Sequence, residues 1–350
     1  MSDHTEAAVL FELGKPLRLT SLKMPGLKPG QVRVKLAYSS VCHTQLLEAR
    51  GKRGPDRFLP HTLGHEASGI VIEAGPEVKK VKSGDHVVLS WIKGLGIDVS
   101  STVYQSSAGS VNSGAVSTFM EETITCENRV TPIPKNMPLK EASLLGCAIP
   151  TGAGVVRHTA KMKKGSSVAV FGIGGIGLSV VLGASLTEPA QLIAVDIASH
   201  KLELAKKLGA THTVNAAQND PAAQILEITN GRGVDYGIEC AGRRQTMETA
   251  FRSVRDQGGL CILIGNLPKG DLISIDPFDL IKGKRIVGTW GGESVPDQDI
   301  PDYVNLFLKG KMDLCSLITH EYSLAEINQS LDDLENGKVG RAVIRMGEAQ

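Results

Sequence analysis

Short apolar runs separated by turn residues dominate the first 90 positions of the chain. Runs of strand length occupy residues 7–11, 31–38, 67–74 and 86–89, and glycine, proline and aspartate lie between them. This arrangement is typical of β-strands joined by tight turns. Residues 94–118 are instead rich in serine and glycine and predict a long surface lobe. The first part of the chain is therefore expected to be mostly β.

Strand-like and helix-like segments alternate from about residue 166 to residue 290. Such alternation predicts a doubly wound parallel sheet with helices on both faces. We expect strands at residues 168–171, 191–195, 234–240, 260–264 and 285–290, and helices at residues 178–186, 200–208, 221–229 and 246–254.

The C-terminal part of the chain predicts two helices and a strand. Pro301 suits the first position of one helix, because the N–H that proline lacks would be unpaired there. Ser323 and Glu326 have the spacing of a capping box for the other helix. The segment 341–346 is expected to form a strand that returns to the first domain. Short helices within 139–152 form the predicted hinge.

Length and composition limit the class of protein. A chain of 350 residues suggests about two domains, which we place at 1–150, completed by 291–350, and at 151–290. A net charge of +1 and an aromatic content of 4% argue against a partner that is nucleic acid. No apolar run predicts a membrane span, and the N-terminus lacks a signal-peptide core. We expect a cytoplasmic protein whose cysteines are thiols or metal ligands.

The stretch from residue 167 to residue 196 contains the most specific motif. Gly172, Gly174 and Gly177 fit the pattern G-x-G-x-x-G between a predicted strand and a predicted helix, and the next strand ends on Asp196. In this context the pattern predicts a dinucleotide-binding turn. One glycine permits the tight turn, another lets the backbone approach a pyrophosphate, and Gly177 lets the helix approach the strand. A glycine-rich turn without a ligand is the alternative.

Asp196 indicates which dinucleotide is bound. Its carboxylate can accept hydrogen bonds from both hydroxyls of an adenosine ribose, and it would repel a 2′-phosphate. The N-terminus of the helix after the glycines would offer N–H groups and a positive dipole end to the phosphates. The sequence therefore predicts NAD rather than NADP.

Cys42, His65 and Cys147 are candidate metal ligands. Thiolate and imidazole groups suit zinc, and three protein ligands would leave a fourth position open for water or substrate, as in catalytic sites. Their spacing does not establish such a site by itself. Each cysteine taken alone is more often a buried thiol, and His65 could form a core pair with Glu66.

Five segments of the chain resemble the motifs of zinc-dependent alcohol dehydrogenases in the medium-chain dehydrogenase/reductase superfamily. They are residues 41–44, 64–66 and 146–152, which are similar to the zinc-ligand motifs, residues 172–177 with Asp196, which are similar to the NAD fingerprint, and Gly340-Arg341 near the C-terminus. The resemblance covers essentially the whole chain. It implies a GroES-like, β-rich catalytic domain and a Rossmann-fold NAD-binding domain.

The resemblance also implies roles for individual residues. One catalytic zinc per chain, on Cys42, His65 and Cys147, would hold the substrate oxygen and lower the pKa of the alcohol. Thr44 would take the alcohol proton, and Glu66 would lie behind the zinc as a supporting or transient ligand. The implied cofactor contacts are His43, Thr151, Gly172, Gly174, Gly175, Ile176, Gly177, Asp196, Lys201, Ile264 and Arg341. Trp91 lies where the family lines its substrate pocket, although it could equally be a packing anchor.

Three departures from the family pattern limit this transfer. Gln45 occupies a position where the family usually has aspartate, so a charge near His65 is lost and the zinc affinity could change. Leu47 replaces a proton-relay histidine, so the relay would end at water or use Glu48. Residues 94–118 contain none of the cysteines that bind a structural zinc in the family, and we expect no second zinc.

The sequence therefore predicts an NAD-dependent zinc alcohol dehydrogenase that converts an alcohol to an aldehyde or ketone, or the reverse. A family member acting on a sugar, a cyclitol or a thiol–aldehyde adduct is the nearest alternative. An NAD-binding protein without turnover is an alternative of another class, but it would have no use for an open metal site. The resemblance further implies a homodimer or homotetramer, in which the strand at 285–290 could pair across an axis.

Overall fold

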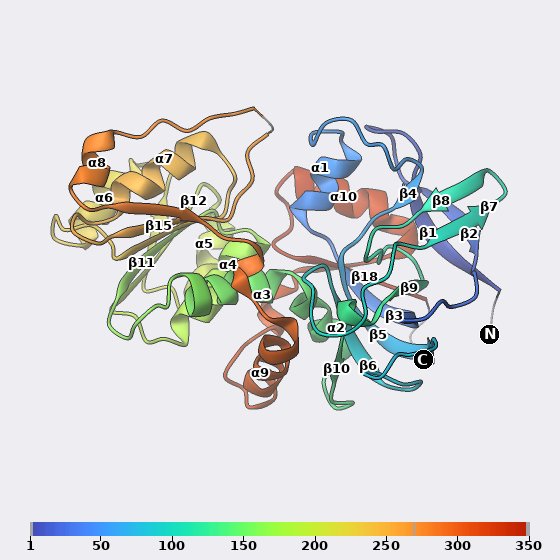
Figure 1. Ribbon diagram of the computed structural model, residues 1–350. Helices are drawn as coiled ribbons and strands as arrows, with labels where there is room; N and C mark the ends of the chain where they lie inside the picture. Colours follow the sequence, from blue (N-terminus) through green and yellow to red (C-terminus); the bar gives the residue numbers. More distant parts are fainter. Residues whose placement is uncertain (1–2, 269, 348–350) are drawn as a thin grey trace. The chain divides into compact units, whose positions relative to one another are not determined.

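The computed structural model describes residues 3–268 and 270–347 (Figure 1). The chain divides into two units, one formed by residues 1–147, 295–309 and 318–350 and the other by residues 148–294 and 310–317. We call them the metal unit and the sheet unit. The short segments 291–294 and 310–317, which were expected in the first domain, belong to the sheet unit, where their 3-10 turns pack against its helices.

A closed barrel forms one part of the metal unit. Its strands follow the order β1-β2-β7-β8-β4, with bounds β1 His4–Leu10, β2 Arg18–Lys23, β4 His61–Thr62, β7 Val103–Ser106 and β8 Gly109–Asn112. The segment 94–118, predicted as a surface lobe, thus contributes a hairpin to the barrel. The prediction missed it because serine and glycine hide the alternation: Tyr104 and Val111 are fully buried, and their neighbours in the strands face outward.

A second sheet follows the order β10-β6-β5-β3-β18-β17, and β9 also pairs with β3. The bounds are β3 Gln31–Ser40, β5 Glu66–Ala74, β6 His86–Ser90, β9 Glu122–Cys126, β10 Val130–Ile133, β17 His320–Ser323 and β18 Ala342–Arg345. Strand β18 runs antiparallel to β3, with Val343 opposite Ser40. The predicted return of the C-terminal strand to the first domain is confirmed.

The lobe of the metal unit is ordered by a buried carboxylate. Glu127 accepts hydrogen bonds from the backbone N–H groups of Lys79, Lys80 and Ile97, at 2.6, 2.7 and 2.9 Å. These bonds hold the pKa of Glu127 below its usual value, although burial acts in the opposite direction. One side chain therefore ties the loop around residue 97 to the turn around residue 80.

Four α-helices are described in the metal unit, namely α1 His43–Ala49, α2 Leu139–Ala142, α9 Pro296–Leu308 and α10 Ile327–Glu335, with 3-10 turns at Glu127–Arg129, Ser143–Gly146 and Leu324–Glu326. Pro301 does not open a helix as predicted. Helix α9 begins five residues earlier, because Pro296 takes the first position and the Asp299 carboxylate accepts the Val295 N–H at 2.7 Å. The capping box of Ser323 and Glu326 is confirmed, and it starts the 3-10 turn that leads into α10.

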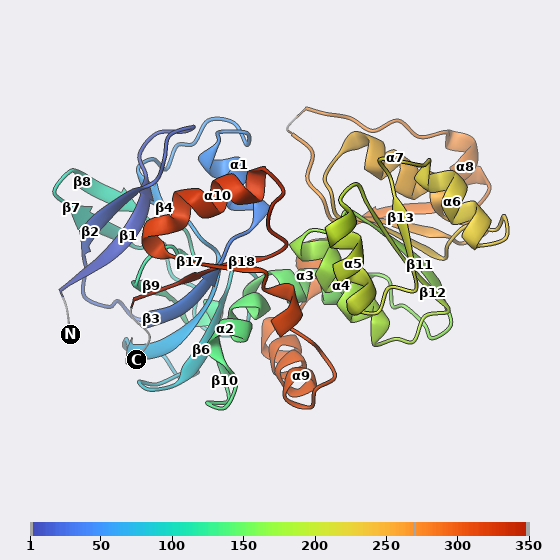
Figure 2. The ribbon, with the colours of Figure 1, turned by 180° about the vertical axis from the view of Figure 1, so that it is seen from behind.

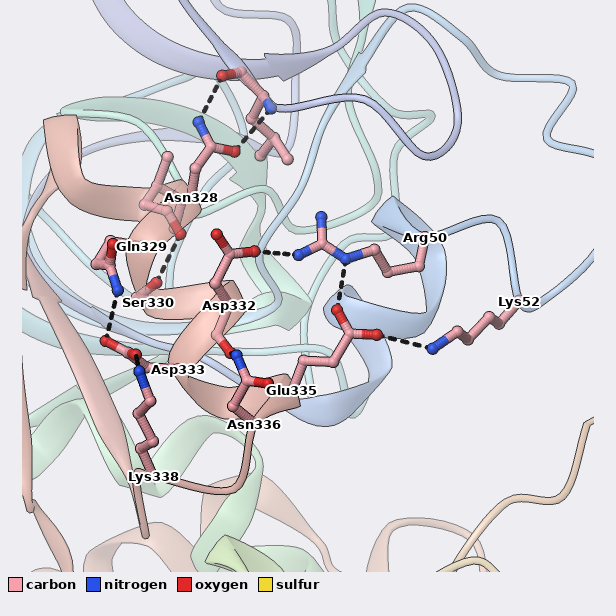
Figure 3. Close-up of polar contacts among 12 residues, drawn as sticks. Arg50, Lys52, Asn328, Gln329, Ser330, Asp332, Asp333, Glu335, Asn336 and Lys338 are labelled. Atoms are coloured by element: carbon pink, nitrogen blue, oxygen red, sulfur yellow. Dashed lines mark hydrogen bonds and ion pairs between the residues drawn. The ribbon is translucent and has the colours of Figure 1, made fainter.

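Helix α10 holds the end of α1 in place (Figures 2 and 3). Arg50 directly follows α1, and its guanidinium pairs with Asp332 and, at 2.8 Å, with Glu335. Lys52 also pairs with Glu335 at 2.8 Å. One helical turn before Asp332 on α10, the Asn328 amide exchanges two hydrogen bonds of 2.8 Å with the backbone of Leu17. The helix that follows Cys42 is thereby anchored at its far end.

The sheet unit contains the predicted doubly wound parallel sheet. Its strands lie in the order β13-β12-β11-β14-β15-β16, and each neighbouring pair is parallel. Helices α4 and α5 lie on one side and α6 and α7 on the other (Figures 1 and 2). The strands are β11 Ser167–Phe171, β12 Gln191–Asp196, β13 His212–Asn215, β14 Tyr236–Glu239, β15 Leu260–Leu263 and β16 Arg285–Gly288.

The helices of the sheet unit connect these strands. They are α3 Ala148–Gly154, α4 Gly175–Ser185, α5 Ser199–Lys207, α6 Pro221–Ile228, α7 Arg244–Ser253 and α8 Pro277–Ile281, with a π-helical turn at Val155–Thr159 and 3-10 turns at Gly291–Glu293 and Cys315–Leu317. Among the residues described, no helix is both long enough and apolar enough to span a membrane.

Candidate metal centre and dinucleotide turn

The metal unit brings Cys42, His65 and Cys147 together. The candidate ligand atoms of these three residues all lie within 4.8 Å of one another, and both cysteines are buried. Two thiols and an imidazole form a donor set that zinc prefers, and three ligands leave a tetrahedral ion one open position. The arrangement fits a catalytic zinc, as the sequence predicted.

The sheet pairing explains why these residues meet. Strands β3 and β5 run antiparallel with Ser39 opposite Ala67, so Cys42, just after β3, and His65, just before β5, lie at the same end of the pair. Cys147 reaches them because Gly146 lets the backbone pass close to this end: an added Cβ at Gly146 would lie 2.2 Å from the Leu89 carbonyl oxygen.

The surroundings of Cys42 favour its thiolate. A hydrogen bond from the Cys147 side chain is the largest influence, and together with His65 and the charge of Arg341 it places the pKa of Cys42 well below the ordinary value, although burial opposes this. Because the thiolate is the form that binds a metal, the cluster is prepared for a divalent cation.

Glu66 and Arg341 form a buried ion pair beside the cluster. Their side chains are 0% and 4% exposed, and the guanidinium also donates to the Ser40 hydroxyl at 3.0 Å. Burial lowers the pKa of Arg341, and the nearby Cys42 opposes that shift. The structure thus places Arg341 against Glu66. A contact of Arg341 with the cofactor, and ligation of zinc by Glu66, stay predictions.

Three further side chains surround the ligands. The Cys42 sulfur lies 3.9 Å from the Thr44 hydroxyl oxygen, within hydrogen-bond reach. The Gln45 amide contacts both the backbone of Cys42 and the ring of His65. Trp91 packs edge-on against His65, with 6.5 Å between ring centroids and 68° between ring planes. The indole of Trp91 therefore forms an aromatic wall beside the metal ligands.

The glycine turn of the sheet unit has the geometry of a phosphate cradle. Gly172 has φ +88°, and a Cβ there would lie 2.7 Å from the Cβ of Ala241. Gly174 caps helix α4, and a Cβ on it would meet no atom within 4 Å, so the space over the helix N-terminus is open. At Gly177, a Cβ would lie 2.0 Å from the carbonyl oxygen of Gly172, which requires glycine where the helix meets the turn. These features fit a bound pyrophosphate.

Asp196 lies at the end of β12, next to the glycine turn. Its carboxylate accepts the N–H of Ile173 at 2.7 Å and the N–H of Ala198 at 2.9 Å. The carboxylate therefore orders the turn itself, in addition to its predicted role at the ribose. Sequence reasoning missed this second task, because a bond between residues 23 positions apart depends on how β12 lies beside β11.

The other predicted cofactor contacts divide between the two units. Thr151 is buried in α3, Ile176 and Lys201 are half-buried in α4 and α5, and Ile264 follows β15, all in the sheet unit. His43 is exposed at the start of α1 in the metal unit. Their predicted contacts with the dinucleotide stay predictions.

Sequence reasoning also missed the residues that hold the metal ligands from outside. Ser40 binds Arg341, and Arg50 binds α10, yet the partners lie 301 and 285 positions away in the chain. No local spacing signals a contact of this kind, because it depends on the C-terminal strand and helix returning to the metal unit.

Comparison with known proteins supports the same reading of both units. The family model described as "Alcohol dehydrogenase GroES-like domain" matches residues 28–135, and the model described as "Zinc-binding dehydrogenase" matches residues 175–309. The predicted fold class, a GroES-like domain with a Rossmann-like domain, is confirmed.

Relatives match along nearly the entire chain. The chain is 34% identical to an S-(hydroxymethyl)glutathione dehydrogenase of Synechocystis, covering 97% of this chain and 99% of the relative. It is 33% identical to alcohol dehydrogenase 1 of Pisum sativum, covering 98% and 97%. Among solved structures, benzyl alcohol dehydrogenase of Acinetobacter calcoaceticus has a TM-score of 0.91 at 32% identity, covering 99% of this chain and 100% of that one. An alcohol dehydrogenase zinc-binding domain protein of Burkholderia ambifaria has a TM-score of 0.92 at 31% identity, covering 99% of each chain.

Proposed function

Because the chain belongs to the zinc-dependent alcohol dehydrogenase family of medium-chain dehydrogenases/reductases, we propose that it oxidises alcohols with an aromatic or other apolar group, using NAD. The protein is a zinc oxidoreductase that acts on CH–OH groups with a nicotinamide dinucleotide. The proposal concerns the substrate class and the residues that act. The observation that supports it is the Cys42–His65–Cys147 cluster with the Trp91 ring beside it.

The residues of the metal unit divide the chemistry among them. Zinc, when bound by Cys42, His65 and Cys147, supplies a Lewis acid that lowers the pKa of the alcohol. Thr44, two residues after the first ligand, accepts the alcohol proton on its hydroxyl oxygen and passes its own proton on. The alcohol carbon loses a hydride to NAD and becomes a carbonyl carbon, so the substrate gives up two electrons and one proton as the hydride and a second proton from its hydroxyl group. Asp196, at the glycine turn, selects NAD over NADP by repelling a 2′-phosphate.

The aromatic wall determines the preferred substrate. The indole of Trp91 stands edge-on to His65, so a substrate bound near the metal ligands would place its apolar part near this ring. Burying the ring of an aromatic alcohol there gains hydrophobic free energy that ethanol cannot supply, since each buried methylene is worth about 0.8 kcal/mol. We therefore expect a larger kcat/KM for benzyl alcohol than for ethanol.

A thiol–aldehyde adduct is the second candidate substrate. The similarity to the Synechocystis S-(hydroxymethyl)glutathione dehydrogenase, over 97% of this chain, favours it. Such an adduct also presents a CH–OH group, so the metal centre would act in the same manner. Only a direct comparison of substrates distinguishes the two.

The assembly proposed for the protein is a homodimer built on the sheet unit. Strand β16 is the last strand in the order of the parallel sheet as far as the structure is described, and a free sheet edge is a template for pairing with another chain. Nearby, Trp290 and Ile281 are 80% and 76% exposed. Light scattering on the Ile281→Asp variant should show monomer if these residues form the interface. A cytoplasmic location is proposed as well, because all six cysteines are free.

The test combines zinc analysis with a substrate panel. Protein purified without chelator should contain about one zinc per chain, and with NAD it should oxidise benzyl alcohol faster than ethanol or S-(hydroxymethyl)glutathione. Trp91→Ala should remove the preference for benzyl alcohol, and Trp91→Phe, the matched control, should keep most of it. Zinc-free protein with full activity would overturn the mechanism, and a preference for the glutathione adduct would favour the second candidate.

Proton acceptance by Thr44 is tested separately. Thr44→Val should slow turnover strongly while leaving zinc content unchanged, because valine has the shape of threonine without the hydroxyl. Thr44→Ser retains the hydroxyl and should retain most of the rate. Normal turnover in the valine variant would show that another group accepts the proton.

A further inference from the structure

The Gln45 amide lies between two fixed partners beside the metal ligands. Its Oε1 accepts the backbone N–H of Cys42 at 2.8 Å, and its Nε2 contacts Nδ1 of His65. The side chain is fully buried. The first of these bonds is half of a capping box at the start of α1, which fixes the position of the amide.

The backbone of Cys42 determines which end of the amide points to His65. A backbone N–H can only donate, so it requires the amide oxygen. Turning the amide over would place two donor groups, the Cys42 N–H and the amide NH₂, against each other. The NH₂ end therefore faces His65, and Nδ1 of that ring must offer a lone pair to it.

This requirement determines where the proton of a neutral His65 lies. A neutral imidazole has one N–H, and with Nδ1 acting as acceptor, that proton is on Nε2. Nδ1 is already engaged by Gln45, so the buried Nε2 is the atom left for the metal. A metal ion needs the Nε2 lone pair, which this tautomer does not provide.

Zinc binding must therefore disturb the arrangement around Gln45. The proton has to move to Nδ1, where it meets the amide NH₂, or the amide has to turn over and leave the Cys42 N–H facing a donor. A carboxylate at position 45 would avoid this conflict, because one oxygen could accept from Cys42 while the other accepts from Nδ1–H of His65. Hydrogen-bond partners of this kind typically change metal affinity by about 10- to 100-fold.

We propose that Gln45 is a positioning residue that holds His65 in the tautomer unsuited to zinc and so makes the zinc of this protein readily exchangeable, an inference that rests on the proposed zinc-dependent function. Gln45→Glu, which has the same shape and two acceptor oxygens, then retains zinc more tightly than the natural protein. The effect concerns retention of the ion and is measured without turnover.

The first experiment follows zinc release from the full-length, zinc-loaded protein to a chromophoric chelator. Gln45→Glu should release zinc at least about tenfold more slowly than the natural protein. Gln105→Glu, the same change at an exposed position of strand β7, controls for net charge and should behave as the natural protein. Equal or faster release from Gln45→Glu would overturn the proposal. If neither protein bound zinc, both this proposal and the zinc mechanism would fail, whereas zinc bound only by Gln45→Glu would support the proposal.

The second experiment detects the tautomer directly and needs no charge change. Two-bond ¹H–¹⁵N spectra of zinc-free protein with ¹⁵N-labelled histidine rings report which ring nitrogen is protonated, and His65→Asn identifies the His65 signals. The natural protein should show a bare Nδ1 and a protonated Nε2, and Gln45→Glu should show the reverse. A protonated Nδ1 in the zinc-free natural protein would overturn the proposal even if the variant failed to fold.

Discussion

The buried carboxylate of Glu66 is paired with the guanidinium of Arg341, although 275 positions separate the two residues in the chain. Removing one partner leaves the other charge buried and uncompensated, which costs about 3–5 kcal/mol. We expect Arg341→Met to lower the free energy of unfolding of the metal unit by roughly this amount. Urea denaturation monitored by a probe in the metal unit measures the loss.

The double variant Arg341→Met/Glu66→Gln provides the control for this pair. With the carboxylate removed as well, no charge is left stranded, and part of the lost stability should return. A loss below about 1 kcal/mol in the single variant would mean that solvent reaches the pair, as it does for surface ion pairs.

Cys147→Ala should separate metal binding from dinucleotide binding. The variant lacks one of the three ligands, so its zinc content should fall well below one ion per chain. Loss of the Lewis acid removes several kcal/mol of transition-state stabilisation, so kcat should fall on the order of 10³-fold. NAD affinity, measured by calorimetry, should be unchanged because the glycine turn lies in the other unit. Cys261→Ala, in the core of the sheet unit, is the control for loss of a thiol. Activity surviving without metal would refute the proposed mechanism.

Asp196→Ala should relax the preference for NAD. Losing a carboxylate that would bind the ribose hydroxyls and repel a 2′-phosphate should change the NADP/NAD ratio of kcat/KM by about 10- to 100-fold, as expected for hydrogen bonds to a charged group. Since the carboxylate also accepts the N–H of Ile173 and Ala198, Asp196→Asn is the gentler variant: it keeps the size and an acceptor oxygen. An unchanged ratio in both variants would place Asp196 away from the ribose.

Glu48 is the candidate proton acceptor beyond Thr44. The two residues lie one turn apart on α1, where side chains i and i+4 share a face. Burial raises the pKa of Glu48, and Arg53, paired with it at 2.8 Å, acts in the opposite direction. Only the carboxylate accepts a proton, so kcat should fall as pH drops through this raised pKa, which lies above 4.5. Glu48→Gln should abolish that acid limb, and an unchanged profile would show that the relay ends at water.

The ion pairs between the residues just after α1 and helix α10 should make stability depend on pH in the acid range (Figure 3). Hydrogen bonds from Lys52 and then Arg50 lower the pKa of Glu335 from 4.5 to about 2. A lowered folded-state pKa means that the stabilisation is complete above 4.5 and is lost as pH falls towards about 2. The Tm advantage over Glu335→Gln should therefore be largest at neutral pH and shrink below pH 4.5. Because these groups are near solvent, the ion pairs of Glu335 should contribute less than about 1 kcal/mol to the free energy of unfolding. A Tm difference that stays constant with pH would contradict a contribution from these ion pairs.

The sequence by itself determined the features that depend on neighbours in the chain. The glycine turn and Asp196 fall within 25 consecutive residues, and the alternation of strands and helices around them requires a parallel sheet. The capping box at Ser323 depends on a spacing of three residues and was found directly. The three ligands were also identified from the sequence, but only through their resemblance to family motifs.

Tertiary structure alone decided the features that join distant segments. The antiparallel register of β3 and β5 brings Cys42 beside His65, and the return of the C-terminal strand brings Arg341 to Glu66. Spacing in the sequence cannot reveal such contacts, because they depend on strand register and on which segments share a core. The orientation of the Gln45 amide is decided in the same way: its sequence position shows a missing carboxylate, but only the fixed N–H of Cys42 shows which end faces His65.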